Sequence, residues 1–368
     1  MMKSRLNRAL TGAAVAASVT TATGAIAEEV TIRMTSTFPQ GINLIEADIR
    51  FAETVNRLGK GIIQIDFFPG GDLVPSGQVF DAVQSGAIEA SADWPGYWAG
   101  SNTAFGLIGA FPMLFNAGDY RNWVTNWGGA ELIDGIYGEF GIKYLPHYVL
   151  SAESGLRSTS ALTSLEDLSG KRLRMSGRPQ GEILRQLGAA QVQLPGSEVY
   201  QSLERGVVDA AEFSVPSTDL SMGFQEVTEH VLSPGWHQPG SMGGVMIKAS
   251  VWEGLDDQQQ AVLETAAQAT MNWSTGHYDR GSAAALRKFE EAGTQVHQLS
   301  EEELATLQTM SNKVLEDESC ANPKFAEVAV SMLDYLADYE QWRGMQGEFA
   351  GGRNLSELPD IEKIRGCL

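Results

Sequence analysis

The stretch LVPSGQVFDAVQSGAIEAS, residues 73–91, has a counterpart 120 positions later in QLPGSEVYQSLERGVVDAA, residues 193–211. Both copies contain a proline that opens a helix, a glycine that ends it and a short apolar run typical of a strand. The spacing is long for a solenoid repeat, so the copies favour two similar lobes that face each other. A chance match between two ordinary helix–strand units is the alternative.

Strand and helix patterns alternate around these copies as far as about residue 215. Residues 30–36 and 61–68 read as strands, and residues 43–58 have helical spacing. This order predicts an α/β, two-lobed periplasmic binding protein fold with mostly parallel sheets and a ligand cleft between the lobes. The expected parts are lobe I over 28–150, completed by part of 240–368; the lobe II core over 151–239, completed by C-terminal helices; and long helices in 256–368 that pack across both lobes.

The N-terminus has the pattern of a secretory signal peptide. Lys3, Arg5 and Arg8 precede an apolar, alanine-rich run, and Ala25-Ile26-Ala27 is a typical cleavage signal. We therefore expect residues 1–27 to be removed after Ala27 and the protein to be periplasmic; a membrane anchor is the alternative. Losing three cations and no acids would take the net charge from −20 to −23. Such an acidic chain argues against nucleic acid and anionic lipid as partners.

The two cysteines, Cys320 and Cys367, both lie in the part expected to be exported. Because the periplasm is oxidising, a single disulfide between them is the simplest interpretation. Two free, buried thiols are the alternative. Two cysteines are too few for a structural zinc site with four cysteine ligands.

No sequence motif indicates catalysis. The five histidines lack H-E-x-x-H spacing, and there is no G-x-S-x-G, C-x-x-C or P-loop pattern. Aromatic and polar residues instead follow the strands of both repeat copies, in DWPGYW (93–98) and EFSVPSTD (212–219), and also occur in PGWHQPG (234–240). Trp94, Tyr97 and Trp236 are therefore candidates for the wall of a ligand pocket, and ordinary core aromatics are the alternative.

The order of these features resembles the DctP-type solute-binding proteins of tripartite ATP-independent periplasmic (TRAP) transporters. The resemblance covers most of the chain after residue 27. It is strongest over 167–213, which carries the Gly-Lys lead, an arginine on a strand, the LGA-x-x-V-x-LP motif, a tyrosine and DA-x-E. LVPSGQVFDAVQSGAIE (73–89) and PGW (234–236) look most like the branch that binds 2-oxo acids and related carboxylates.

The resemblance implies roles for particular residues in KRLRMSG, residues 171–177, and beyond it. Arg174 takes the position of the arginine that holds the ligand carboxylate, since a guanidinium can donate two parallel hydrogen bonds. Glu212 takes the position of an acidic residue near a bound Na⁺ or Ca²⁺. Phe213 stands where the branch usually has Trp, and Gln238, the second metal candidate, stands where it often has Glu. The stretch 151–158 carries no clear Gln ligand.

The function that the resemblance implies is capture of a small organic acid anion and delivery to the membrane subunits of a TRAP permease, without catalysis. A secreted α/β enzyme acting on small carboxylates and a ligand-sensing subunit of a signalling system are the alternatives. Lys171 and Arg172 are expected to be solvated charges. Residues 325–342 have apolar side chains at helical spacing, which favours either a homodimer through this helix or packing on the protein's own lobes.

Overall fold

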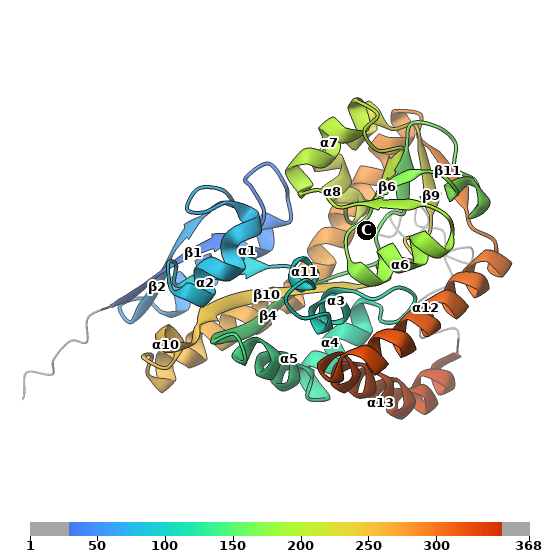
Figure 1. Ribbon diagram of the computed structural model, residues 1–368. Coiled ribbons are helices and arrows are strands. Elements are labelled where there is room, and N and C mark those ends of the chain that lie inside the picture. The colour runs from blue at the N-terminus through green and yellow to red at the C-terminus, as the bar shows by residue number, and fades with distance from the viewer. Residues whose placement is uncertain (1–28, 348–368) are drawn as a thin grey trace, which may run out of the picture.

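The structure is a computed structural model that describes residues 29–347. Two sheets lie side by side, each with its own helices (Figure 1). The first has the order β2-β1-β3-β10-β4 and the second β11-β9-β5-β8-β6-β7. The strands of the first are β1 (Val30–Ser36), β2 (Ile63–Phe68), β3 (Ala90–Asp93), β4 (Ile142–Leu150) and β10 (Ser241–Lys248). Those of the second are β5 (Leu156–Ser158), β6 (Arg172–Arg174), β7 (Ala190–Val192), β8 (Ala210–Ala211), β9 (His230–Ser233) and β11 (Gln295–Gln298).

Both sheets are mixed, with parallel pairs in a slight majority. Strand β10 runs antiparallel to β3 and β4, and β5 runs antiparallel to β8 and β9. The other five pairings between these strands are parallel. The predicted fold class is thus confirmed, and the antiparallel strands β10 and β5 are the elements that the alternating pattern did not distinguish.

The helices pack around both sheets (Figure 1). The α-helices are α1 (Ile45–Leu58), α2 (Val79–Ser85), α3 (Ala104–Gly109), α4 (Ala117–Asn126), α5 (Gly129–Gly138), α6 (Arg178–Gln186), α7 (Gly196–Glu204), α8 (Pro216–Ser221), α9 (Phe224–Val227), α10 (Ala249–Trp252), α11 (Asp257–Glu291), α12 (Glu301–Ala321) and α13 (Pro323–Gln346). Short 3₁₀ helices are η1 (Ser76–Gln78), η2 (Pro95–Trp98) and η3 (Glu166–Leu168). We call the first sheet with α1 and α2 lobe I, and the second sheet with α6–α9 lobe II; their sequence boundaries stay a prediction.

The two repeat copies fold alike, one in each lobe. In the first, α2 ends at Gly86 with φ of +79° and leads into β3; in the second, α7 is followed by Gly206 with φ of +65° and then β8. Glycine adopts this left-handed conformation without the steric cost that a Cβ would add. The helix–glycine–strand prediction is confirmed in both copies, and the strand ends β3 and β8 therefore occupy equivalent places.

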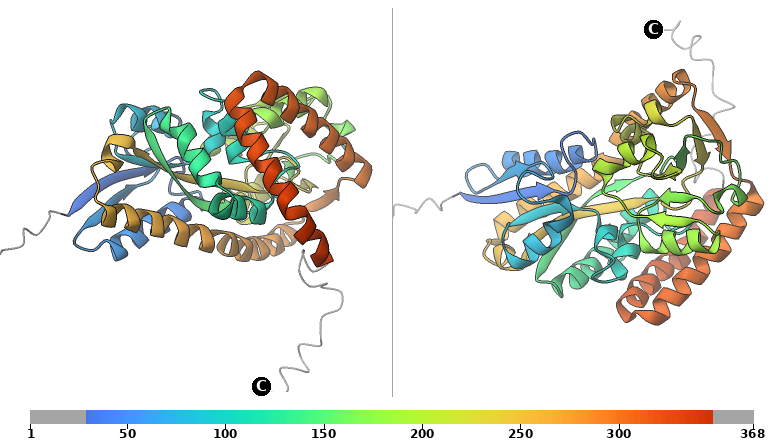
Figure 2. Two further views of the ribbon diagram at one scale, coloured as in Figure 1. Left: turned by 90° about the horizontal axis from the view of Figure 1, so that it is seen from below. Right: turned by 45° about the horizontal axis from the view of Figure 1, so that its top comes forward.

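Helix α11 runs the length of the molecule, as Figure 2 shows, and touches both lobes. It packs on α1 and β4 on one side and on α8 on the other. Asp256 caps its first turn by accepting from the backbone N–H of Gln259, whose side chain accepts from the Asp256 N–H in return. Strands β4 and β10 lie on one side of the first sheet, and the chain passes to and from lobe II where Leu150, at the end of β4, pairs with Ser241, at the start of β10 (Figure 1).

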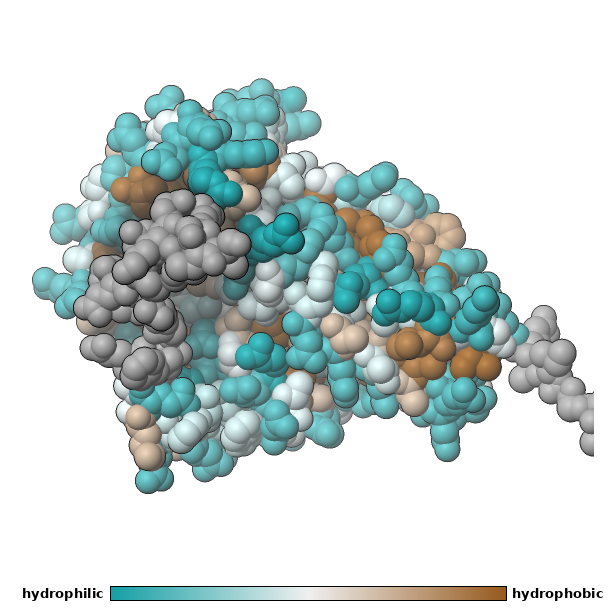
Figure 3. Space-filling model, turned by 180° about the vertical axis from the view of Figure 1, so that it is seen from behind, coloured by the Kyte–Doolittle hydropathy of each residue, from teal (hydrophilic) through white to brown (hydrophobic). Residues whose placement is uncertain are grey.

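The surface is mainly polar. The face drawn in Figure 3 is largely hydrophilic, with its apolar residues in separate small patches. Within residues 29–347, no helix combines the length and the apolar character that crossing a bilayer requires.

Candidate ligand site between the lobes

A small chamber lies between the lobes, bounded by the loops that follow the repeat strands. Its volume is about 20 Å³. Strand β3 leads into its Trp94 and Tyr97, strand β8 leads into its Phe213, and the segment after β4 brings Glu153. The lining residues are Phe38, Leu44, Trp94, Tyr97, Tyr148, Leu150, Glu153, Ser176, Phe213, Ser214, Gln238 and Ser241. The loops that follow the two equivalent strands, β3 and β8, are far apart in the sequence but line the same chamber.

Arg174 lies beside this chamber and is 1% exposed. Its Nη1 donates to the side chain and the backbone carbonyl of Glu212, both at 2.8 Å, and its Nε and Nη2 donate to the Leu194 carbonyl at 3.3 and 3.1 Å. A guanidinium has five N–H donors, so these four bonds leave one on Nη2. The expected two-bond grip on a carboxylate is therefore not available in this arrangement unless the bonds to Leu194 are released.

Arg172, two residues earlier on β6, has a different environment. Its side chain is half exposed and pairs with Asp209 at 3.1 Å. Strand alternation would put Arg172 and Arg174 on one face. The short strand instead ends at Arg174, whose side chain turns inward beneath the ring of Phe213, 5.2 Å from its centroid. Of the two arginines, Arg174 is buried beside the chamber and Arg172 is half exposed.

Two carboxylates and a histidine meet beside Arg174. Ligand atoms of Glu153, Glu212 and His237 all lie within 4.8 Å of one another. Glu212 accepts from Arg174 through Oε1, while its buried Oε2 has no protein partner among the described residues. His237 Nε2 lies 2.9 Å from Glu153 Oε2. The unpaired oxygen can accept a hydrogen bond or coordinate a cation.

The protonation of this cluster follows from its burial. Removal from water, together with the nearby charge of Glu212, raises the pKa of Glu153 well above its usual range. Burial lowers the pKa of His237 to about 4, so this imidazole is neutral at pH 7. With a neutral histidine, Arg174 supplies the positive charge that faces Glu212, and the raised pKa of Glu153 favours its protonated form unless a cation binds beside it.

The donor set suits a hard cation such as Na⁺ or Ca²⁺. These ions prefer oxygen ligands, and Glu153 and Glu212 bring carboxylate oxygens together while Gln238 lines the same chamber. Glu212 and Gln238 were the metal ligands expected from the sequence. The sequence does not indicate Glu153 or His237. Glu153 is a single acidic residue in the stretch 151–158, and His237 lies between Trp236 and Gln238 without the spacing of a metal motif.

The expected aromatic residues separate into two groups. Trp94 is anchored by a 2.9 Å hydrogen bond from its indole N–H to Ser241, and Tyr97 packs edge-on against it at 5.0 Å. Both line the chamber with Phe213. Trp236 does not line it; its indole belongs to the main hydrophobic core, and its carbonyl accepts from the Met113 N–H. The interpretation of Trp236 as a pocket wall is therefore corrected to a core residue that holds the neighbouring His237 in place.

The loop bearing Trp94 and Tyr97 is fixed from behind by Asp93. Its carboxylate accepts hydrogen bonds from Trp98, Tyr137 and Tyr144, at 2.7 to 2.9 Å. Tyr144 reaches it across Gly244, where an added Cβ would come within 2.3 Å of the Tyr144 ring. Glycine at that position permits the close approach of β10 to the tyrosine.

Residues 36–320 match the family model of the bacterial extracellular solute-binding proteins, family 7, the DctP family. The chain belongs to this family. Its members are solute-binding proteins, which fits the lack of a catalytic motif in the sequence.

Relatives whose names state a ligand align with most of this chain. A monocarboxylate 2-oxoacid-binding periplasmic protein of Nostoc sp. is 28% identical over 326 residues, covering 89% of this chain and 86% of its own. A TRAP solute-binding protein of Bordetella bronchiseptica, a mixed-occupancy dimer with copurified calcium and picolinate, is 28% identical with a TM-score of 0.82, covering 86% of this chain and 95% of its own. One from Colwellia psychrerythraea, with calcium and pyruvate, is 25% identical with a TM-score of 0.80, covering 86% and 97%.

Proposed function

We propose that the protein is the extracytoplasmic binding subunit of a TRAP transporter, which captures a small 2-oxo acid or other monocarboxylate together with Na⁺ or Ca²⁺. It then delivers the anion to the membrane permease. The cluster of Arg174, Glu212 and Glu153 carries this proposal. Because Glu212 already neutralises Arg174 and Glu153 is a second acidic group, the cluster offers an organic anion no net positive charge unless a cation is bound. The carboxylate ligands and cations of the relatives support it.

Each residue of the site has a distinct part in this function. Glu212 and Glu153 would hold the cation through their carboxylates, and the cation would supply the positive charge that the ligand carboxylate needs. Arg174 fixes the position of Glu212 and presents its remaining Nη2 N–H toward the ligand. Trp94, Tyr97 and Phe213 exclude water around the ligand, which strengthens every charged contact inside.

Calorimetric titration tests the proposal directly. Purified protein, treated with chelator and dialysed, is titrated with pyruvate in the presence and absence of calcium, and separately with sodium. We expect binding that is at least tenfold tighter with one of the two cations. Binding of no 2-oxo acid under any cation condition would refute the proposal, whereas turnover of the acid would favour the enzyme alternative.

Export and assembly complete the proposal. We infer that residues 1–27, which lie outside the described residues, are a signal peptide cleaved after Ala27, and that the mature protein is periplasmic. A homodimer through α13 is supported by the exposure of Val330, Leu333 and Trp342 on a helix that also packs on α12, α3 and α5. Light scattering at micromolar concentration gives one chain mass or two, and a monomer would reject the dimer.

The disulfide between Cys320 and Cys367 stays part of the proposal. Cys320 is exposed near the end of α12, while Cys367 lies outside the described residues. Closing a loop of 48 residues would stabilise the protein by about 3–4 kcal/mol if the bridge is unstrained. Intact-mass measurement after alkylation, with and without reductant, decides it, because two modified thiols without reductant would exclude the bridge.

A further inference from the structure

A second, larger chamber opens directly beyond the small one. Its volume is about 690 Å³, against about 20 Å³ for the inner chamber, and the two share Phe38, Tyr97 and Ser176 as walls. A space of 20 Å³ admits little more than a water-sized group. Any ligand whose carboxylate reaches the Arg174 cluster must therefore place the rest of its body in the outer chamber.

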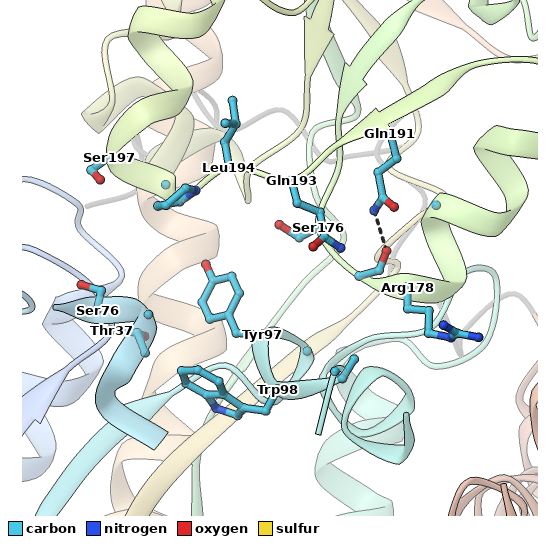
Figure 4. A pocket seen from close by; sticks show the side chains of 18 of the residues that line it. Thr37, Ser76, Tyr97, Trp98, Ser176, Arg178, Gln191, Gln193, Leu194 and Ser197 are labelled. Carbon is cyan, nitrogen blue, oxygen red and sulfur yellow. Dashed lines mark hydrogen bonds between the residues drawn. The ribbon is translucent and has the colours of Figure 1, made fainter. Parts of the chain in front are cut away.

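The outer chamber is lined by neutral polar groups from both lobes. Figure 4 shows Thr37 and Ser76 on one side, with Ser176, Gln193 and Ser197 on the other. None of these five side chains hydrogen-bonds to another residue within the described part of the chain. Thr37 is the most informative, because its hydroxyl is buried, faces no protein partner and is only 6% exposed. A buried hydroxyl without a partner is costly, so it favours a ligand that can satisfy it.

The charged groups around this chamber are already paired with each other. Arg178 donates to Glu318 at 2.8 Å, across the space between α6 and α12, and Glu182 accepts from Arg185 at 2.5 Å. The Arg178 side chain is also 59% exposed, which weakens it as a partner for a buried anion. The outer chamber therefore offers hydrogen bonds to neutral groups and has no spare buried cation for a second carboxylate within residues 29–347.

We propose that this chamber binds an uncharged, hydroxylated tail, so that the preferred ligand is a polyhydroxylated monocarboxylic 2-oxo acid larger than pyruvate. The inference rests on the proposed function, since it takes the carboxylate end to lie at Arg174. Phe38, Tyr97 and Trp98 supply flat apolar walls against the C–H faces of such a tail. Thr37, Gln193 and the serines supply donors and acceptors for its hydroxyls.

Three ligands, titrated calorimetrically into the cation-loaded protein, separate this inference from the proposed function. Pyruvate tests the inner site alone. 2-Oxogluconate carries a hydroxylated tail, and 2-oxohexanoate carries an alkyl tail on a chain of the same length. We expect 2-oxogluconate to bind at least about tenfold more tightly than 2-oxohexanoate, since one or two net hydrogen bonds are worth that factor. If the alkyl acid binds equally well or better while pyruvate still binds, the inference fails and the proposed function stands. If none of the three binds, the proposed function itself fails.

Two substitutions locate the preference in the outer chamber. Gln193→Met keeps the length of the side chain and removes its amide, and Thr37→Val keeps the shape and removes the unpaired hydroxyl. Each should reduce the preference for 2-oxogluconate over 2-oxohexanoate by about threefold to tenfold. Gln295→Met, on the exposed strand β11, is the matched control and should leave the preference unchanged. An unchanged preference in both chamber variants, with melting temperatures showing folded protein, would overturn the assignment.

Discussion

Two buried carboxylates follow the equivalent strands of the two repeat copies, and their surroundings differ. Asp93 ends β3 in lobe I and meets three neutral donors, the indole of Trp98 and the hydroxyls of Tyr137 and Tyr144. Glu212 follows β8 in lobe II and meets the guanidinium of Arg174 on one oxygen only. Both carboxylates are at most 1% exposed, so burial alone does not distinguish them.

The difference separates a structural carboxylate from one that can serve a ligand. At Asp93 burial outweighs the hydrogen bonds and raises the pKa to about 7, yet every neighbouring group is satisfied within the fold. At Glu212 the guanidinium balances the charge of the carboxylate, while burial and the charge of Glu212 raise the pKa of the adjacent Glu153 and favour its protonated form. The neutral donors around Asp93 complete its hydrogen bonds and fix the loop that carries Trp94. The unpaired oxygen of Glu212 instead remains able to coordinate a bound cation.

Removing Arg174 should have the largest effect. In Arg174→Ala, Glu212 loses the guanidinium with which it pairs, and a broken buried pair typically costs about 3–5 kcal/mol. We expect at least a hundredfold loss of 2-oxo acid affinity by calorimetry, and a lower melting temperature. Arg174→Lys should recover only part of the affinity, because an ammonium cannot reproduce the bonds to Glu212 and Leu194.

Arg172→Ala is the matched control for this variant, on the same strand. Its half-exposed pair with Asp209 is worth under about 1 kcal/mol, so the affinity should change by less than about threefold. Loss of binding in Arg172→Ala with retention in Arg174→Ala would reverse the assignment of the two arginines and remove the proposed site.

Glu153→Gln should produce the next largest effect, on cation dependence. The pKa of Glu153 is raised in the folded protein, so its protonated form is favoured, and stability from this group is lost as pH rises from about 4.5 toward the folded value. In chelator at pH 8 the variant should therefore melt at a higher temperature than the wild type. Calcium should stabilise the wild type more at pH 8 than at pH 5. At each pH it should stabilise the variant less than the wild type. Equal calcium stabilisation of both proteins would exclude Glu153 as a cation ligand.

The sequence predicted the fold well because repeated local signals agree with it. Pro75 and Pro195 open the helices of the two units and Gly86 and Gly206 end them, and the helical spacing of 325–342 falls within α13. The antiparallel course of β10 depends on long-range pairing with β3 and β4, which no local pattern encodes.

The site was predictable only in part. Arg174 and Glu212 stand in a stretch with recognisable motifs, but the bonds from Arg174 to Leu194, 20 residues away, follow from the turn of the chain after β7. Glu153 and His237 are brought together by the pairing of residue 153 with Gly235, which lies between β9 and β10. An isolated glutamate and histidine carry no spacing signal, so only the tertiary structure joins them to the cluster.

Asp93→Asn should have the smallest effect on binding and sharpens the comparison most. Because the folded pKa of Asp93 is raised to about 7 from 3.8, the stability from its protonated form is present below pH 3.8 and is lost as pH rises to about 7. Over that window the free energy of unfolding should fall by at most about 1.4 kcal/mol per pH unit in the wild type, and Asp93→Asn should remove this part of the slope.

Calcium should not alter the Asp93 contribution, whereas it should suppress that of Glu153. Affinity for the 2-oxo acid should change by less than about threefold, since Asp93 touches Trp98 and not the ligand chamber. Chemical denaturation from pH 4 to 8, with calcium and with chelator, measures all of this. A calcium-sensitive slope at Asp93, or a loss of affinity as large as that of Arg174→Ala, would show that the carboxylate of the first copy also belongs to the binding site.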